Sequence, residues 1–339
     1  PSGDPNSTPI ENIDMANSDI FMYGDAIFPL FERLRKEDPV HYCPESCVEE
    51  VGAYWSITKY NDIMEVDTNH KVFSSEGSIT LFDPEEDFTT PMFIAMDPPK
   101  HDIQRKAVNP VVAPSNLINM KDLIRERTAE VLDNLPRNKQ FNWVEEVSIE
   151  LTTRMLATLF DFPFHDRRKL TRWSDVSTAR PGDGIVDTEE QRKEELFECL
   201  EYFTRIWNDR VNSEPKTDLV SMLAHNPSTR NMDPMEYLGN LILLIVGGND
   251  TTRNSMTGGV LALNQNLDQY EKLRKDNSLI YSMVPEIIRW QTPLAYMRRT
   301  ALEDYELGGK LIKKGDKVIM WYVSGNRDEE VIDNPNSFL

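Results

Sequence analysis

A long apolar segment that is broken by glycine and polar residues constrains the fold of this chain more than any other feature. Asp233-Pro234 is a typical helix start, and the helical pattern continues past Leu261. Within it, the apolar run Leu241–Val246 is followed directly by Gly247-Gly248-Asn249-Asp250-Thr251-Thr252. Each glycine inside a helix costs about 1 kcal/mol relative to alanine, and buried polar side chains add a desolvation cost. Such a concentration of unfavourable residues indicates a functional site.

These residue types suit the binding of a large, flat molecule. Glycines without side chains let such a molecule approach the helix backbone. A threonine hydroxyl can donate to the carbonyl one turn earlier and open the helix, and an acid beside it can relay protons. The alternative is close helix packing through Gly247 and Gly248, with Asp250-Thr251-Thr252 facing water, and the hexapeptide alone leaves both interpretations open.

The charge balance excludes several kinds of partner. The chain has 339 residues, with 57 acidic against 37 basic side chains and a net charge of −20. Binding to nucleic acid or to an anionic membrane depends on Lys and Arg, so the balance argues against both. No run approaches the roughly 18 apolar residues of a membrane span, and the first residues lack a secretory signal pattern. We therefore expect a cytoplasmic protein without a membrane span.

The hydrophobic pattern predicts a mostly helical domain over residues 21–339, preceded by a polar tail over residues 1–20. The expected helices are Ile27–Leu34, one capped by Asn61, one opened by Asp97-Pro98-Pro99 and one over Leu196–Val211. The expected strands are Val40–Tyr42, Tyr54–Tyr60, Tyr305–Leu307, Lys310–Ile312 and Lys317–Val323. A small sheet would thus combine both ends of the chain. Residues 177–187 predict a flexible connection between helices.

The three cysteines, Cys43, Cys47 and Cys199, are too few and odd in number for a disulfide framework. His41 lies close to Cys43 and Cys47, which gives three potential zinc ligands. A structural zinc site uses four ligands, and the sequence offers no second cluster. We expect free thiols in a reducing compartment.

Three further motifs contain charged groups that can bind an acid or form an ion pair. His101 and Arg105 lie at i and i+4 near the start of a helix, where together they offer two donors to a carboxylate or phosphate. Arg298-Arg299 stands at the entry to the C-terminal strands. Glu286 and Arg289 share a helix face, and their apolar surroundings favour a partly buried ion pair. Each motif alone is also compatible with a solvated surface.

The order and spacing of these motifs resemble those of the cytochrome P-450 monooxygenases. The series consists of His101-x-x-x-Arg105, Gly247–Thr252, Glu286-x-x-Arg289, Pro293, Arg299 and Asn326-Arg327-Asp328. The resemblance extends from about Phe28 to Leu339 and implies the P-450 fold, which is mainly α with a small β-sheet. Gly247–Asn264 and Val284–Ala301 look closest to the soluble bacterial branch that hydroxylates alkanes and fatty acids at the terminal carbon.

The resemblance implies a site for haem b. By this comparison, His101, Arg105 and Arg299 would hold the two haem propionates. Gly247 and Gly248 would lie where the long helix passes over the haem and leaves room for dioxygen.

The same resemblance implies roles in catalysis and in substrate binding. Asp250 and Thr251 match an acid–alcohol pair that delivers protons for cleavage of the O–O bond. The residues that match the lining of the substrate pocket are Leu243, Val246 and Ala295. Glu286 and Arg289 match a structural ion pair, and residues 177–187 match a mobile lid.

One expected element of the family is missing. Its iron is held by a Cys thiolate in the pattern Phe-x-x-Gly-x-x-x-Cys, which does not occur in this chain. Cys43, Cys47 and Cys199 all lie far upstream of Glu286, so none of them matches. We therefore expect a C-terminally truncated P-450 domain whose axial Cys lies beyond Leu339, and we expect these 339 residues alone to be inactive.

The expected activity of the parent protein is insertion of one atom of dioxygen into an unactivated C–H bond, at the end of a medium-chain alkane or fatty acid. Electrons would come from NAD(P)H through a ferredoxin reductase and a ferredoxin, because the chain has no flavin-binding fingerprint. Two alternatives stay open: a non-catalytic haem-binding protein of the same fold, and a helical scaffold without a cofactor.

Overall fold

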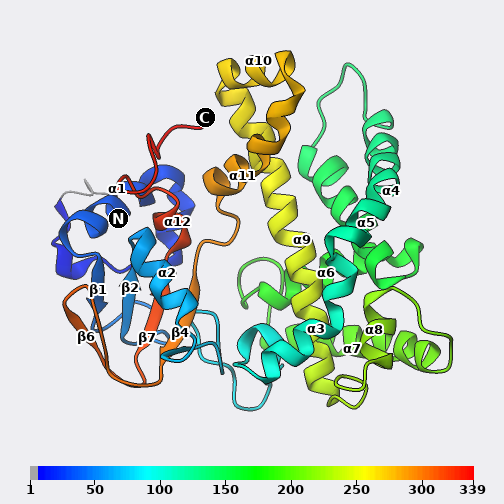
Figure 1. The fold of residues 1–339 in the computed structure, drawn as a ribbon, viewed down its shortest axis with the longest axis horizontal. Helices are drawn as coiled ribbons and strands as arrows, with labels where there is room; N and C mark the ends of the chain where they lie inside the picture. The colour runs from blue at the N-terminus through cyan, green and yellow to red at the C-terminus, as the bar shows by residue number, and fades with distance from the viewer. Residues whose placement is uncertain (1–6) are drawn as a thin grey trace. The chain divides into compact units, whose positions relative to one another are not determined.

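The computed structural model describes residues 7–339 and divides the chain into two compact units (Figure 1). Unit 1 consists of the residues up to Phe88, of Ile94–Asp97 and of Ala262–Leu339. Unit 2 consists of Thr89–Phe93 and Pro98–Leu261. The prediction of one domain over residues 21–339 stays a prediction.

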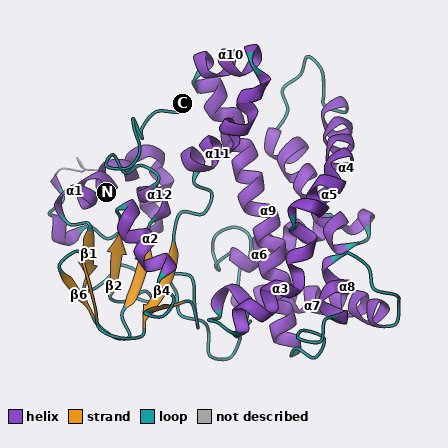
Figure 2. Cartoon of the chain, in the orientation of Figure 1, coloured by secondary structure: helices purple, strands orange, loops and turns teal. Residues whose placement is uncertain are grey.

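Helices make up most of the described chain, as Figure 2 shows. They are α1 (Ile27–Glu37), α2 (Tyr60–Thr68), α3 (Lys100–Val112), α4 (Pro114–Asp133), α5 (Glu150–Phe160), α6 (Arg168–Thr178), α7 (Glu189–Val211), α8 (Leu219–His225), α9 (Pro234–Gln265), α10 (Leu267–Lys275), α11 (Ile280–Gln291) and α12 (Tyr322–Gly325). The strands are β1 (Val40–Cys43), β2 (Tyr54–Ile57), β3 (Phe73–Ser74), β4 (Met297–Ala301), β5 (Tyr305–Leu307), β6 (Lys310–Ile312) and β7 (Lys317–Met320). The predicted class, mainly α with small sheets, is confirmed.

Unit 1 contains a five-stranded sheet in the order β1-β2-β7-β4-β3. Strand β2 pairs in parallel with β7, so that Trp55 lies opposite Val318, and β4 pairs antiparallel with β7. The predicted sheet from both ends of the chain is therefore confirmed for β1, β2 and β7, whereas β5 and β6 pair with each other in a separate two-stranded sheet. Along β7 the side chains alternate between two buried clusters: Ile319 packs with the cluster of α1, whereas Val318 and Met320 pack with that of α2.

The N-terminal residues differ from the predicted polar tail. Residues 1–6 lie outside the described part of the chain, but Ile13, Met15, Ala16 and Ile20 are buried in the cluster of α1. Short 3-10 turns at Ile10–Asn12 and Ser18–Ala26 bring these side chains inward. The sequence did not indicate this burial because the Pro, Ser, Asn and Asp residues around them give the segment the composition of a tail.

Two helix starts lie where the sequence predicts them, but their caps differ. Helix α2 begins at Tyr60, one residue before the predicted cap Asn61, and the Tyr60 backbone N–H donates to Asp328. Helix α3 begins at Lys100 without a side-chain cap, because Asp97 accepts hydrogen bonds from Ser74 and Ser75 instead. Tertiary partners thus replace the local caps in both cases.

Helix α9 is continuous from Pro234 to Gln265 and organises unit 2. The segment Thr89–Phe93 crosses it at Gly239, where an added Cβ would lie 2.1 Å from the Pro91 carbonyl oxygen. Next to this crossing, the Phe93 backbone N–H donates to Asn240 Oδ1 at 2.9 Å. The glycine therefore allows a close backbone approach that no other residue would permit.

The predicted connection over residues 177–187 lies between α6 and α7, and its role as a lid stays a prediction. Over the described residues, the model contains no helix that is long and apolar enough to cross a membrane.

We predict that Gly239→Ala lowers the free energy of unfolding by about 1 to 3 kcal/mol, because the methyl group overpacks against a backbone that cannot move freely. Urea unfolding followed by circular dichroism measures this change. Gly247→Ala is the matched control in the same helix, since an added Cβ there meets no atom within 4 Å. Equal destabilisation by both variants would contradict the role of Gly239.

Candidate functional site

The two central glycines of α9 have different surroundings. An added Cβ at Gly248 would lie 2.7 Å from a methyl group of Leu156 in α5, so this glycine permits close helix packing. At Gly247 no atom lies within 4 Å of that position, and the residue is exposed. The packing interpretation thus applies to Gly248, whereas Gly247 leaves one face of the helix open.

Thr251 makes the hydrogen bond that the sequence predicts. Its Oγ1 donates to the Gly247 carbonyl oxygen, one turn earlier, at 3.0 Å. The helix does not open there, because α9 continues without a break. The hydroxyl is instead held beside the open face, with its lone pairs available to accept a hydrogen bond.

The Asp250 carboxylate lies in a polar network. Its Oδ1 accepts from Arg253 Nη2 at 2.7 Å and from Asn249 Nδ2 at 3.1 Å. Asn249 is fully buried and accepts from Thr152 of α5 at 2.9 Å. Burial raises the pKa of Asp250, while Arg253 acts in the opposite direction and Asp175 adds to the rise. The neutral form of this carboxyl is therefore favoured more than it would be for an aspartate in water.

Arg253 and Asp175 were missed in the sequence. Arg253 follows Asp250 by three residues, which is ion-pair spacing on a helix and a usable signal. Asp175 belongs to α6, and no local pattern connects it with α9.

His101 and Arg105 lie on α3 in unit 2, as predicted. His101 Nδ1 bonds to the Phe93 carbonyl oxygen at 2.8 Å, which fixes the ring orientation. Arg105 is exposed and, among the described residues, makes no ion pair or side-chain hydrogen bond. Its guanidinium is therefore available to a carboxylate ligand.

Arg299 lies on β4 in unit 1, and its guanidinium already has partners. Nη2 pairs with Asp67 at 2.6 Å, and Nη1 donates to the Arg298 carbonyl oxygen. Arg298 itself pairs with Asp83. A carboxylate bound by Arg299 would have to share it with Asp67, and joint binding of one ligand by Arg299 and His101 stays a prediction.

The three predicted substrate-lining residues lie on two elements. Leu243 and Val246 are partly exposed on α9, close to Gly247 in the chain. Ala295, in unit 1, packs against the buried cluster of α1. Their contact with a substrate stays a prediction.

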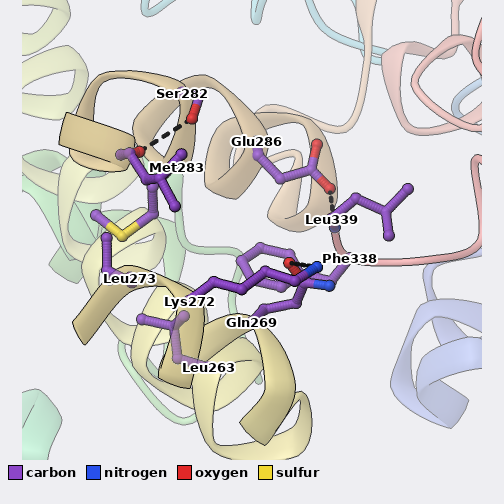
Figure 3. Close-up of a pocket in the computed structure, with 10 residues that line it drawn as sticks. Leu263, Gln269, Lys272, Leu273, Ser282, Met283, Glu286, Phe338 and Leu339 are labelled. Atoms are coloured by element: carbon purple, nitrogen blue, oxygen red, sulfur yellow. Dashed lines mark hydrogen bonds between the residues drawn. The ribbon is translucent and has the colours of Figure 1, made fainter. Parts of the chain in front are cut away.

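Glu286 and Arg289 form the predicted ion pair on α11. Arg289 Nε and Nη2 each bond to a different carboxylate oxygen at 2.7 Å. Figure 3 shows Glu286 at a cavity beside Leu339, whose backbone N–H donates to it at 3.0 Å. Burial alone would raise the pKa of Glu286, but these hydrogen bonds outweigh it and hold the pKa below its usual value.

Arg289 also binds the backbone that follows α12. Its Nη1 donates to the carbonyl oxygens of Asn326 and Pro335, and its Nη2 donates to that of Ser337. Arg327 supports this arrangement from a buried position, with its guanidinium 4.0 Å from the Trp290 ring centroid. Burial lowers the pKa of Arg327 to about 10, and the charge of Arg289 acts in the same direction. The bonds of Arg289 to the backbone after α12, together with the cation–π contact of Arg327, give the Glu286–Arg289 ion pair a structural role.

None of the cysteines has the character of a metal-binding thiolate. Burial raises the pKa of Cys43 and of Cys47 to about 11, and the pKa of the buried Cys199 is raised as well. Both ring nitrogens of His41 are bonded, to Asp38 and to the Ile13 carbonyl oxygen. Within residues 7–339, no three His, Cys, Asp or Glu side chains form a metal cluster.

We predict that Glu286→Gln lowers the free energy of unfolding by about 2 to 4 kcal/mol at pH 7, because it leaves Arg289 without its charged partner. The folded-state pKa of Glu286 lies below the ordinary 4.5. The stabilisation is therefore complete above pH 4.5 and is lost as the pH falls through the folded-state value.

Urea unfolding of both proteins at pH 7, 5 and 3 measures this difference, which should shrink at acidic pH. Glu37→Gln is the control, since its ion pair with Arg33 is exposed. A difference that is constant with pH would contradict the assignment.

Comparisons with known proteins agree with the fold and the order of the motifs. The family model described as Cytochrome P450 matches residues 183–339. Linalool 8-monooxygenase of Pseudomonas putida is 31% identical to this chain over an alignment of 343 positions, which covers 97% of the chain and 83% of that protein. Methyl-branched lipid omega-hydroxylase of Mycobacterium bovis is 30% identical, with 98% and 80% covered.

A solved structure is also similar. Cytochrome P450-153 from Novosphingobium aromaticivorans superposes with a TM-score of 0.87 and 46% identity, over 96% of this chain and 82% of that one. Together with the identity to a monooxygenase over most of its length, this similarity shows that the chain belongs to the cytochrome P450 family of monooxygenases.

Proposed function

We propose that the parent protein of this chain hydroxylates the terminal carbon of a medium-chain alkane or fatty acid. The observation that carries this proposal is the face of α9 with open space at Gly247 and a fixed hydroxyl at Thr251. The partly exposed Leu243 and Val246 lie within a turn or so of this opening in the chain and offer an apolar surface. Among the relatives, one carries a name that states omega-hydroxylation of a lipid.

The described residues fit the haem that the family implies. No atom lies within 4 Å of the Cβ position of Gly247, so no side chain at this point would keep a macrocycle from the helix, and His101 and Arg105 would supply two donors for a propionate. Arg299 would add a third donor. When bound, the haem supplies the iron chemistry that activates dioxygen.

The residues of the chain contribute to this reaction through binding and proton control. Leu243, Val246 and Ala295 would orient an apolar substrate and exclude water. Thr251 Oγ1 gives its proton to Gly247, so it accepts a hydrogen bond from water or from a protonated oxygen at the open face. The Asp250 carboxyl, whose burial favours its neutral form, would hold the proton that is passed on.

The electron donors belong to this proposal as well. We expect NAD(P)H to act through a ferredoxin reductase and a ferredoxin in the cytoplasm. Because the chain carries a net charge of −20, an acidic ferredoxin would require a local basic patch for docking.

We predict that Thr251→Ala uncouples the haem-loaded enzyme. NAD(P)H consumption should continue while product falls about 10-fold or more and hydrogen peroxide rises, because proton delivery is lost from the site. Product, NAD(P)H and peroxide are measured together. The control is Thr252→Ala, because Thr252 is exposed and makes no side-chain hydrogen bond among the described residues.

The two alternative functions give different results in the same assay. A non-catalytic haem binder of this fold forms no product, either before or after the substitution of Thr251 or Thr252. A helical scaffold without a cofactor shows no Soret absorption.

We predict that linear substrates bind more tightly than branched ones of equal carbon number. Titration of the haem-loaded parent protein with decane, decanoic acid and a ten-carbon terpene alcohol, followed by the shift of the Soret band, measures their affinities. Product analysis then gives the carbon that is oxidised. Preference for the terpene alcohol, or oxidation inside the chain, would contradict the proposed substrate class.

A further inference from the structure

The backbone of Phe93 is held from two helices of unit 2. Its N–H donates to Asn240 Oδ1 of α9 at 2.9 Å, and its carbonyl oxygen accepts from His101 Nδ1 of α3 at 2.8 Å. The rings of Phe93 and His101 also meet edge to face, with their centroids 6.1 Å apart. Asn240 is fully buried, and a buried backbone N–H needs such an acceptor. Phe93 therefore connects a side chain of α9 with the ring of His101.

The partners of Asn240 allow its amide group only one orientation. A backbone N–H can only donate, so the amide oxygen must face Phe93. Asn240 Nδ2 then donates to Gln104 Oε1 at 3.1 Å, and Gln104 Nε2 donates to Glu236 Oε1. The Glu236 carboxylate, with Lys100 at 3.6 Å, can only accept. Neither amide can turn over without placing donor against donor and acceptor against acceptor.

Two consecutive residues of α9 thus hold the segment Thr89–Phe93. Gly239 lets the Pro91 carbonyl oxygen approach the helix backbone, and Asn240 accepts from the Phe93 N–H. Gln104, which keeps Asn240 in its orientation, is itself only 5% exposed. Water cannot easily replace these partners, so the loss of one of them leaves a buried polar group unsatisfied.

The Phe93 carbonyl oxygen also fixes a proton on His101. A carbonyl oxygen can only accept, so Nδ1 of His101 carries a proton. Nε2 makes no hydrogen bond within residues 7–339 and is left for a ligand. In a neutral ring with its proton on Nδ1, Nε2 is an acceptor. His101 can therefore donate to a carboxylate only as the imidazolium, with a proton on each nitrogen.

We propose that Asn240 positions His101 for a haem carboxylate and that it acts through the backbone of Phe93. This inference rests on the role proposed above for His101. Asn240 does not touch the ligand: it holds Phe93, and Phe93 holds the ring by Nδ1, so that Nε2 remains for the carboxylate. The imidazolium and the carboxylate then form a charge-assisted hydrogen bond, which is stronger than a neutral one. Gln104 and Glu236 keep Asn240 in its orientation.

The test is a double-mutant cycle on the rate at which the haem-loaded parent protein loses haem to excess apomyoglobin. Asn240→Leu is similar in volume and removes both hydrogen bonds, whereas His101→Phe keeps a ring beside Phe93 and removes the donor. Each single variant should speed haem loss by about 10-fold, because a charge-assisted hydrogen bond is lost or misplaced. The double variant should be little faster than His101→Phe alone, because Asn240 acts through His101.

Two further variants serve as controls. Asn240→Asp keeps an oxygen for the Phe93 N–H and should lose haem at close to the original rate. Thr153→Val is matched for the loss of a buried hydrogen bond in unit 2, since Thr153 is fully buried and its hydroxyl bonds only to carbonyl oxygens of the preceding turn. It should not change haem loss. Circular dichroism verifies folding, and Gln104→Met, which removes the acceptor of Asn240 Nδ2, replaces Asn240→Leu in the cycle if that variant does not fold.

A second measurement follows the ring of His101 directly. ¹⁵N NMR of the histidine-labelled, haem-loaded parent protein in its diamagnetic ferrous carbonyl form reports which ring nitrogens carry protons. The signals of His101 are assigned by their absence in His101→Phe. We expect protons on both nitrogens, with the Nδ1 proton slow to exchange with water. Asn240→Leu should speed this exchange, whereas Thr153→Val should not, and a merely structural role of Asn240 would not distinguish the two variants.

Three results would overturn the proposal. The first is a full additional effect of Asn240→Leu in the His101→Phe background. The second is haem loss in Asn240→Asp that is as fast as in Asn240→Leu. The third is a neutral His101 ring in the haem-loaded protein.

The positioning role and the role on which it rests fail in different ways. If His101→Phe keeps its haem as well as the unchanged protein does, the proposed binding of a propionate by His101 is wrong, and the positioning role falls with it. If His101→Phe loses haem faster but Asn240→Leu adds its full effect, only the role of Asn240 is wrong. Both readouts are independent of whether the parent protein hydroxylates an alkane or a fatty acid.

Discussion

The approach of neighbouring groups to the backbone of α9 is the constraint on which unit 2 depends. At Gly239 the segment Thr89–Phe93 crosses the helix so closely that no Cβ fits, and at Gly248 a leucine of α5 occupies the same kind of space. Gly247 differs, because its side-chain position is open. The helix is thus closely packed at Gly239 and Gly248 and open at Gly247, one turn before Thr251, whose hydroxyl donates to the Gly247 carbonyl oxygen. The open space beside Gly247 results from where the neighbouring side chains stop, as much as from the glycine itself.

Unit 1 depends on a second constraint, the need of buried guanidinium groups for acceptors. Arg289 and Arg327 donate hydrogen bonds to carbonyl oxygens of the backbone after α12. The carboxylate of Glu286 neutralises the charge of Arg289. Backbone without regular secondary structure is held in place by such donors, since it has no internal hydrogen-bond ladder. The sheet supplies the frame, because β2 and β7 join the two ends of the chain in parallel.

The sequence was a good guide where the signal is local. The sheet from both ends of the chain, the helix that begins at Pro234 and the i, i+3 pair of Glu286 and Arg289 follow from periodicity, turn residues and spacing. It failed where the partner is distant. Asp97 looks like a cap but binds Ser74 and Ser75, and the residues around Met15 look like a tail but are buried. Likewise, no local pattern indicates that Asp175 shares Arg253 with Asp250.

The two acid–arginine pairs show why spacing alone does not decide function. Asp250–Arg253 and Glu286–Arg289 have the same i, i+3 spacing, similar exposure and similar distances. Their pKa shifts nevertheless have opposite directions. Glu286 accepts hydrogen bonds from Nε and Nη2 of Arg289 and from the backbone N–H of Leu339. These bonds favour its charged form more than burial opposes it, so its pKa is lowered and the pair is fixed. Asp250 receives one arginine nitrogen, which is shared with a second carboxylate, and one amide nitrogen from Asn249, so burial prevails and its pKa is raised. The second partner of each arginine, which only the tertiary fold supplies, therefore decides the direction in which the pKa of its acid is shifted.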